Sequence, residues 1–244
     1  MFFDLVQKNS RTKGYFAIWS LSSFVIIFKN SKSLKQEDDL TTGKKGHFCR
    51  VIKIVKLLTA ETLYDNLNYV SHSLENRRNY ANLIIAAPQL IPKLLEILFM
   101  VDDKTSCRAA WVLEFMCHDH LDLLAQHLGT FTENIHKVHL DPAVRPVAKI
   151  CELLATAYYS KESNTIKAEL TRKRQERIIE TCFDWMINDE KIAPKAYSMN
   201  TLYLFGQDFD WIRPELAQIL ERDFQMQSSG FKARARHILK KIKS

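Results

Sequence analysis

Glycine and proline are scarce in this chain of 244 residues, which contains six of each. An all-β sandwich or barrel needs a turn roughly every ten residues and relies on these two residue types for it. The sequence also lacks a glycine-rich phosphate loop, a dinucleotide fingerprint and a nucleophile elbow. These absences argue against an all-β fold and against several common enzyme classes, and they leave helices as the expected secondary structure.

The cysteines form no recognisable framework. Their number is odd, their spacing is wide and no Cys-x-x-Cys element occurs among Cys49, Cys107, Cys117, Cys151 and Cys182. Most of them lie within apolar helical patterns, where cysteine behaves as a small hydrophobic residue. We therefore expect no disulfide, no metal site and no cofactor, and a reducing, cytoplasmic location.

Positive charge is concentrated at the N-terminus. The chain carries a net charge of +7, yet residues 1–57 contain eleven Lys or Arg against four Asp or Glu. Residues 58–244 then hold 24 basic and 24 acidic residues, so the body of the protein is neutral. A neutral body weakens a nucleic-acid-binding interpretation, because such binding depends on neutralising phosphates.

Long apolar runs are also missing. The longest, Gly14–Phe28, has fifteen residues and is shorter than the roughly 20 that a membrane-spanning helix needs. No small-x-small cleavage site follows it, which disfavours a secretory signal. A weak membrane anchor, an inefficient signal sequence and a non-structural leader remain open; we favour the leader, which includes a translation start further in, and expect no stable membrane insertion. The predicted organisation is a poorly ordered basic leader, 1–57, followed by a helical domain, 58–244.

The domain has a helical apolar pattern throughout, with apolar residues at three- and four-residue spacing. The first clear helix pair is broken at Pro88 and carries Leu83, Ile84, Leu90, Leu94, Leu95 and Leu98. A further polar helix is expected over residues 167–187. Its apolar face consists of Leu170, Ile178, Ile179, Phe183 and Met186.

Four of the expected helices have a similar sequence pattern near their N-termini. Arg108, Arg145, Lys195 and Lys232 occupy equivalent places at intervals of 37, 50 and 37 residues. A small residue or proline follows each of them, and a period in this range indicates a helical array. We expect Asp103 and Asp141 to cap their helices, and the basic residue to reach an Asp of its own or a neighbouring repeat. The predicted fold is all-α, a right-handed superhelix of about four to five antiparallel helix pairs.

The segment "DPAVRPVAKICELL" resembles the second helix of a HEAT repeat, through Asp141, Val144, Arg145, Ala148 and Leu153. Residues 58–244 also resemble a family of short, uncharacterised HEAT/armadillo-like bacterial proteins, some of which carry the name adenylosuccinate lyase. The resemblance implies an alpha solenoid and, through that name, a lyase activity. The serine-loop signature of that lyase superfamily has its nearest counterpart in "APKAYSMNTL", which lacks the glycine and the serine pair.

Candidate functional residues fall into two groups. The second helices should line a concave surface, and the residues expected there are Trp111, Glu114, Arg145, Lys149, Glu152 and Tyr197. Glu114 and Glu152 suit either a general base or an inter-repeat ion pair, and the ion pair is the preferred interpretation. A possible phosphate-binding row follows from the four-residue spacing of Lys232, Arg236 and Lys240.

Five of the eight histidines occur between His118 and His139, but their spacing does not bring three ligands together. We expect surface or loop histidines and no catalytic residue.

The favoured function is non-catalytic: a binding or scaffolding module with a macromolecular partner, preferably protein. A HEAT-like DNA-binding or DNA-base-processing protein is the first alternative, and adenylosuccinate lyase activity the weaker one. The sequence does not indicate the oligomeric state.

Overall fold

Helices make up all the regular secondary structure in residues 59–243, the part of the chain that the computed structural model describes. The predicted all-α class is therefore confirmed for this part. The predicted leader and Cys49 lie outside the described residues. The chain divides into two compact units, residues 1–88 and 89–244, so a boundary at Pro88 falls inside the domain expected from residue 58 onward.

The first unit contains α3 (Ala60–Leu67) and α4 (Leu74–Ala86). Thr59 starts α3 with a reciprocal capping box, because the Thr62 amide donates to the Thr59 hydroxyl at 3.4 Å and the Thr59 amide donates to the Thr62 hydroxyl at 3.0 Å. Ser73 caps α4 by accepting from the Asn76 amide. The short helix η1 (Pro88–Leu90) follows α4.

The second unit contains eight longer helices and several short ones. They are α5 (Ile91–Leu98), α6 (Lys104–Asp119), η2 (Leu121–His127), α7 (Leu128–Asn134), η3 (Ile135–Lys137), α8 (Asp141–Tyr158), α9 (Thr165–Glu169), α10 (Arg172–Ile187), α11 (Ile192–Phe205), α12 (Ile212–Asp223), η4 (Phe224–Met226) and α13 (Ser229–Lys243).

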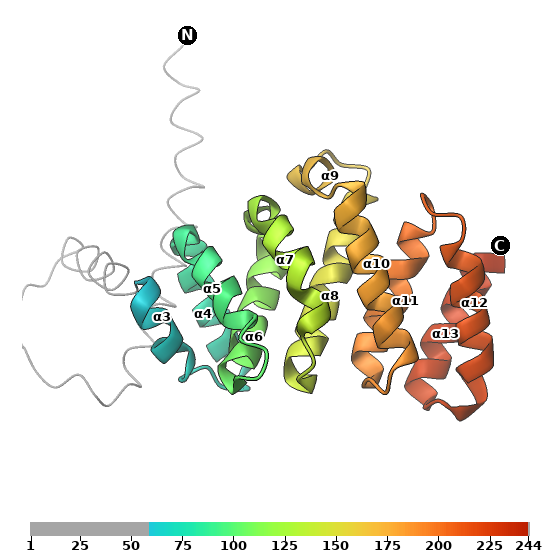
Figure 1. Ribbon diagram of the computed structural model, residues 1–244, viewed down its shortest axis with the longest axis horizontal. Coiled ribbons are helices and arrows are strands. Elements are labelled where there is room, and N and C mark those ends of the chain that lie inside the picture. The colour runs from blue at the N-terminus through green and yellow to red at the C-terminus, as the bar shows by residue number, and fades with distance from the viewer. Residues whose placement is uncertain (1–58, 244) are drawn as a thin grey trace, which may run out of the picture. The chain divides into compact units, whose positions relative to one another are not determined.

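One continuous row of helices runs through this second unit: α6 packs on α8, α8 on α11, and α11 on α13. We call these four the second-helix row. Helices α5, α10 and α12 pack against α6, α11 and α13 respectively, and α7 packs against α10. Figure 1 shows α5, α6, α7, α8, α10 and α11 following one another in chain order, with α12 and α13 next to α11 at the C-terminal end. The equivalent basic residues Arg108, Arg145, Lys195 and Lys232 lie in the first two turns of the four row helices.

The apolar pattern read from the sequence matches the buried side chains. All six apolar residues of the first predicted pair are buried, from Leu83 to Leu98, and so are all five of the predicted face between Leu170 and Met186. Ala109 and Ala110 of α6 and Ala148 of α8 are fully buried, and α6 packs against α8. Small side chains at this contact let the two backbones approach each other closely.

The helix expected over residues 167–187 is two helices, so that prediction was wrong in its continuity. Helix α9 ends at Glu169 and α10 begins at Arg172, because Thr171 has an extended backbone with φ −61° and ψ 159°. The interruption is stabilised by the Gln175 side chain, whose amide donates to the Leu170 carbonyl at 2.9 Å. Leu170 is buried at this break and keeps its predicted apolar role.

The two expected aspartate caps have different outcomes. Asp103 caps α6, since its carboxylate accepts from the Thr105 amide at 2.7 Å. Asp141 is the first residue of α8 and makes no capping hydrogen bond, because Leu140 occupies the cap position and Pro142 has no amide to donate. Asp141 lies instead 3.6 Å from the ammonium of Lys191.

No single helix within residues 59–243 is long and apolar enough to cross a membrane. The two helical segments on either side of the Ala87 break reach the required length and composition only when they are taken together.

Candidate functional site

An ion pair joins the first two helices of the second-helix row. Arg145 of α8 donates from Nη2 to Oε2 of Glu114 in α6 at 2.6 Å. The Glu114 side chain is 12% exposed and that of Arg145 is 35% exposed, so the carboxylate is the more deeply placed partner. The predicted ladder between repeats therefore includes this contact, but its acidic member is Glu114 where an Asp was expected.

A second polar group joins α8 to α11. Glu152 accepts two hydrogen bonds, from Lys149 Nζ at 2.7 Å and from Asn200 Nδ2 at 3.0 Å. The Lys149 ammonium also lies 5.0 Å from the centre of the Tyr197 ring, a cation–π arrangement. Asn200 was not among the sequence candidates; it lies one turn after Ala196, which marks the small-residue face of α11.

The third inter-helix contact involves Trp111. Its indole nitrogen donates to the backbone carbonyl of Pro142 at 2.8 Å. Pro146 lies four residues after Pro142 within α8 and has no amide to donate to that carbonyl. The tryptophan therefore supplies the hydrogen bond that the proline removes.

The six residues expected on the concave surface differ in how deeply they are buried. Trp111, Glu114 and Glu152 are buried, and their polar atoms bond to neighbouring residues. Arg145, Lys149 and Tyr197 remain partly exposed. Glu114 thus forms the ion pair between helices that the sequence interpretation preferred. Glu152 instead pairs with Lys149 of its own helix and reaches α11 only through the neutral amide of Asn200. The accessible part of this surface consists of Arg145, Lys149, Tyr197 and Asn200.

Lys195 is the least exposed of the four equivalent basic residues, at 5%. Its positive charge acts on two carboxylates, Glu190 and Asp223. Burial, and secondarily the charge of Asp141, raise the pKa of Glu190. The hydrogen bond from Arg222 holds the pKa of Asp223 below its ordinary value, and Lys195 contributes less. The Lys195 side chain is thus buried, and its charge acts on two partly exposed carboxylates.

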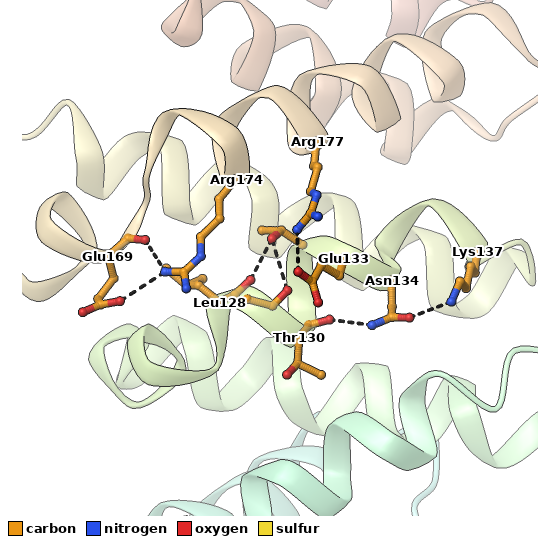
Figure 2. Close-up of polar contacts among 10 residues, drawn as sticks. Leu128, Thr130, Glu133, Asn134, Lys137, Glu169, Arg174 and Arg177 are labelled. Atoms are coloured by element: carbon orange, nitrogen blue, oxygen red, sulfur yellow. Dashed lines mark hydrogen bonds and ion pairs between the residues drawn. The ribbon is translucent and has the colours of Figure 1, made fainter.

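A separate polar face lies between α7 and α10 (Figure 2). Arg177 of α10 donates to Glu133 of α7 at 2.9 Å, and this hydrogen bond lowers the pKa of the Glu133 carboxyl. Arg174 holds the end of α9 through the carboxylate of Glu169 at 3.1 Å and through its backbone carbonyl. Neither arginine was a sequence candidate. Glu133 is 44 residues away from Arg177, and Glu169 is separated from Arg174 by the interruption between α9 and α10. No local sequence pattern therefore identifies these pairs.

This face borders a cavity of about 400 Å³, lined by Thr132, Glu133, His136, Arg177, Glu180, Thr181 and Asp184. Within residues 59–243, no group of three or more His, Cys, Asp or Glu side chains is placed to hold a metal ion. His118, His120, His136 and His139 are exposed, as surface or loop histidines should be. The cavity therefore offers hydrogen-bonding groups without a converging metal site.

The predicted phosphate-binding row lies on α13. Lys232 and Arg236 both lie over the ring of Phe224, at 6.0 and 5.4 Å from its centre. Lys240 is exposed one turn further along. The structure thus keeps Lys232 and Arg236 on one side of α13 and adds Phe224, which was absent from the sequence candidates, to the group.

The segment nearest to the lyase signature, "APKAYSMNTL", lies entirely within α11. Its serine, Ser198, is fully buried, and the hydroxyl has no hydrogen-bond partner among residues 59–243. A mobile serine loop has to present its hydroxyl to a substrate, and a buried helical serine does not.

Comparisons with known proteins found no match: no family model, no curated protein and no solved structure matches this chain.

Proposed function

We propose that this protein is a non-catalytic binding or scaffolding module with a HEAT-like helical array. In this proposal the second-helix row, α6, α8, α11 and α13, presents its exposed side to a protein partner. The helix pairs α5/α6, α7/α8, α10/α11 and α12/α13 are the repeat units. The right-handed superhelical stacking predicted from the sequence belongs to the same proposal.

The proposal rests on the polar side chains that join neighbouring helices of the second-helix row by hydrogen bonds. The Glu114–Arg145 pair and the Glu152–Asn200 hydrogen bond each join a row helix to the next one. Such contacts stabilise stacking, because each holds a buried carboxylate of one helix against a polar group of the next. A surface of this kind suits recognition better than catalysis.

Tyr197 gives the most direct test. A photo-crosslinking amino acid placed at Tyr197 in the full-length protein should form one discrete adduct with the partner in cells, because this side chain is partly exposed at the middle of the row. The measurement is the pattern of crosslinked bands after illumination, followed by identification of the adduct.

The control places the same amino acid at Lys173, an exposed position on α10 outside the row. We expect no discrete adduct from Lys173. Equal adducts from both positions, or none from Tyr197, would contradict the proposal. An adduct with nucleic acid would support the alternative of a HEAT-like DNA-binding protein.

A further inference from the structure

The last helix of the row carries charge of one sign. Helix α13 contains six basic residues and no acidic one: Lys232, Arg234, Arg236, Lys240, Lys241 and Lys243. Its apolar side chains Phe231, Ala235 and Ile238 are buried, and the helix packs against α11 and α12. Since its apolar face is already occupied, α13 is held in place and its basic residues lie on the opposite, accessible side.

Three of these six charges are not neutralised by an ion pair among the described residues. Lys243 pairs with Glu221 at 2.9 Å, but Lys232, Arg236 and Lys240 form no ion pair with any residue in 59–243. These three lie at four-residue spacing, where like charges repel and destabilise a helix. The helix dipole favours cations only in the last turn, so it does not account for Lys232 and Arg236. We call these three residues the α13 cation row.

An apolar depression adjoins the α13 cation row. It has a volume of about 380 Å³ and is lined by Glu221, Phe224, Gln225, Arg236 and Leu239. Phe224 and Leu239 are partly exposed, and Arg236 belongs to both the depression and the row. A ligand that lies on this surface therefore contacts the apolar depression and the three adjacent cations.

We propose that this surface binds an acidic segment of a protein partner. Carboxylates of the segment pair with the α13 cation row, and one bulky apolar side chain enters the depression between Phe224 and Leu239. The inference rests on the proposed function, because α13 is the last helix of the second-helix row. It names the chemistry of the partner: a short stretch rich in Asp and Glu that contains a leucine or a residue of similar size.

A nucleic acid fits the same surface less well. Phosphate binding gains affinity from the number of phosphates neutralised, and here the three cations of the row occupy a single helix. Base stacking needs an accessible ring face, but Lys232 and Arg236 already lie over Phe224. An acidic peptide with an apolar residue uses both the cations and the depression.

The test measures binding of the full-length protein to a fluorescent peptide of about twelve residues that alternates Glu and Asp around one central Leu. The altered protein carries Lys232→Gln, Arg236→Gln and Lys240→Gln, which also removes repulsion within α13. The matched control carries Lys104→Gln, Lys161→Gln and Lys173→Gln, three exposed cations elsewhere. Fluorescence anisotropy gives the Kd, and circular dichroism verifies that both proteins keep the wild-type melting curve.

We expect the α13 changes to weaken binding about tenfold or more, and the control changes to alter it by less than about twofold at roughly 150 mM salt. Replacing the central Leu of the peptide by Ser should weaken binding to the wild-type protein and have little effect in the α13 variant. Equal losses in both variants, or no measurable binding, would overturn the inference. So would tighter binding of a single-stranded oligonucleotide of equal charge through the same three residues.

These outcomes are independent of the Tyr197 crosslink. If the peptide fails to bind while Tyr197 still forms its adduct, the acidic-segment inference is wrong and the scaffold proposal stands. If the peptide binds but Tyr197 forms no adduct, the α13 surface is established and the role proposed for the rest of the row is wrong.

Discussion

Trp111 in α6 donates its indole hydrogen to the carbonyl of Pro142 in α8, at a nitrogen-to-oxygen distance of 2.8 Å. In an uninterrupted helix this carbonyl would accept from the amide of residue 146, but residue 146 is a proline. The proline weakens the local helix, and a side chain of the neighbouring helix α6 compensates for the lost hydrogen bond. The contact makes the packing of α6 on α8 part of the hydrogen bonding of α8 itself.

This relationship predicts a coupling between Trp111 and Pro146. Trp111→Phe removes the donor, and the free energy of unfolding should fall by about 1 kcal/mol beyond the loss of packing. In a Pro146→Ala background, an amide at position 146 can bond to the Pro142 carbonyl, so Trp111→Phe should then cost less. Urea unfolding of the four proteins in a double-mutant cycle measures the coupling. Additive effects would show that the indole hydrogen bond contributes nothing.

Arg145→Ala should lower the free energy of unfolding by roughly 1 to 3 kcal/mol, because it leaves the mostly buried Glu114 carboxylate without this charged partner. The control is Lys191→Ala, which breaks the 3.6 Å pair with Asp141, where both side chains are more than half exposed. Its effect should stay within about 0.5 kcal/mol. A negligible effect of Arg145→Ala, combined with weaker partner binding, would show instead that Arg145 serves recognition.

Glu190 predicts a dependence of stability on pH. Burial and Asp141 raise its pKa above the ordinary value of 4.5, so the folded state holds this proton more tightly than the unfolded state does. Its contribution to stability therefore falls as pH rises from about 4.5 through the raised pKa, and is lowest above it. Glu190→Gln should be more stable than the wild type at neutral pH and show little difference at pH 4. Thermal melts over this range test it, with Glu162→Gln in an exposed loop as a control that should show no such trend.

Some members of the family that the sequence resembles carry the name adenylosuccinate lyase. We expect this protein not to cleave adenylosuccinate. The segment nearest to the catalytic serine loop is part of α11, and Ser198 is fully buried. The absorbance of adenylosuccinate should therefore stay constant when it is incubated with the full-length protein. A decrease in absorbance that Ser198→Ala abolishes would contradict this expectation and would require α11 to open.

The helical class, the buried faces and the Asp103 cap could all be predicted from the sequence. Periodicity determines which side chains of one helix share a face, so Ile178, Ile179 and Met186 were expected inside and are buried. The Asp103 cap depends on an amide only two residues away. Such features need nothing beyond the local chain, and a sequence pattern is sufficient to reveal them.

The partners of the candidate residues depended on the tertiary structure. Arg145 has Asp141 one turn before it, yet it bonds to Glu114, which is 31 residues away. That choice follows from how α6 packs on α8, which small residues permit but do not determine. The same holds for Asn200 with Glu152 and for Phe224 with Arg236. A repeat pattern identifies equivalent positions, but distances between side chains of different helices are determined only when the helices pack.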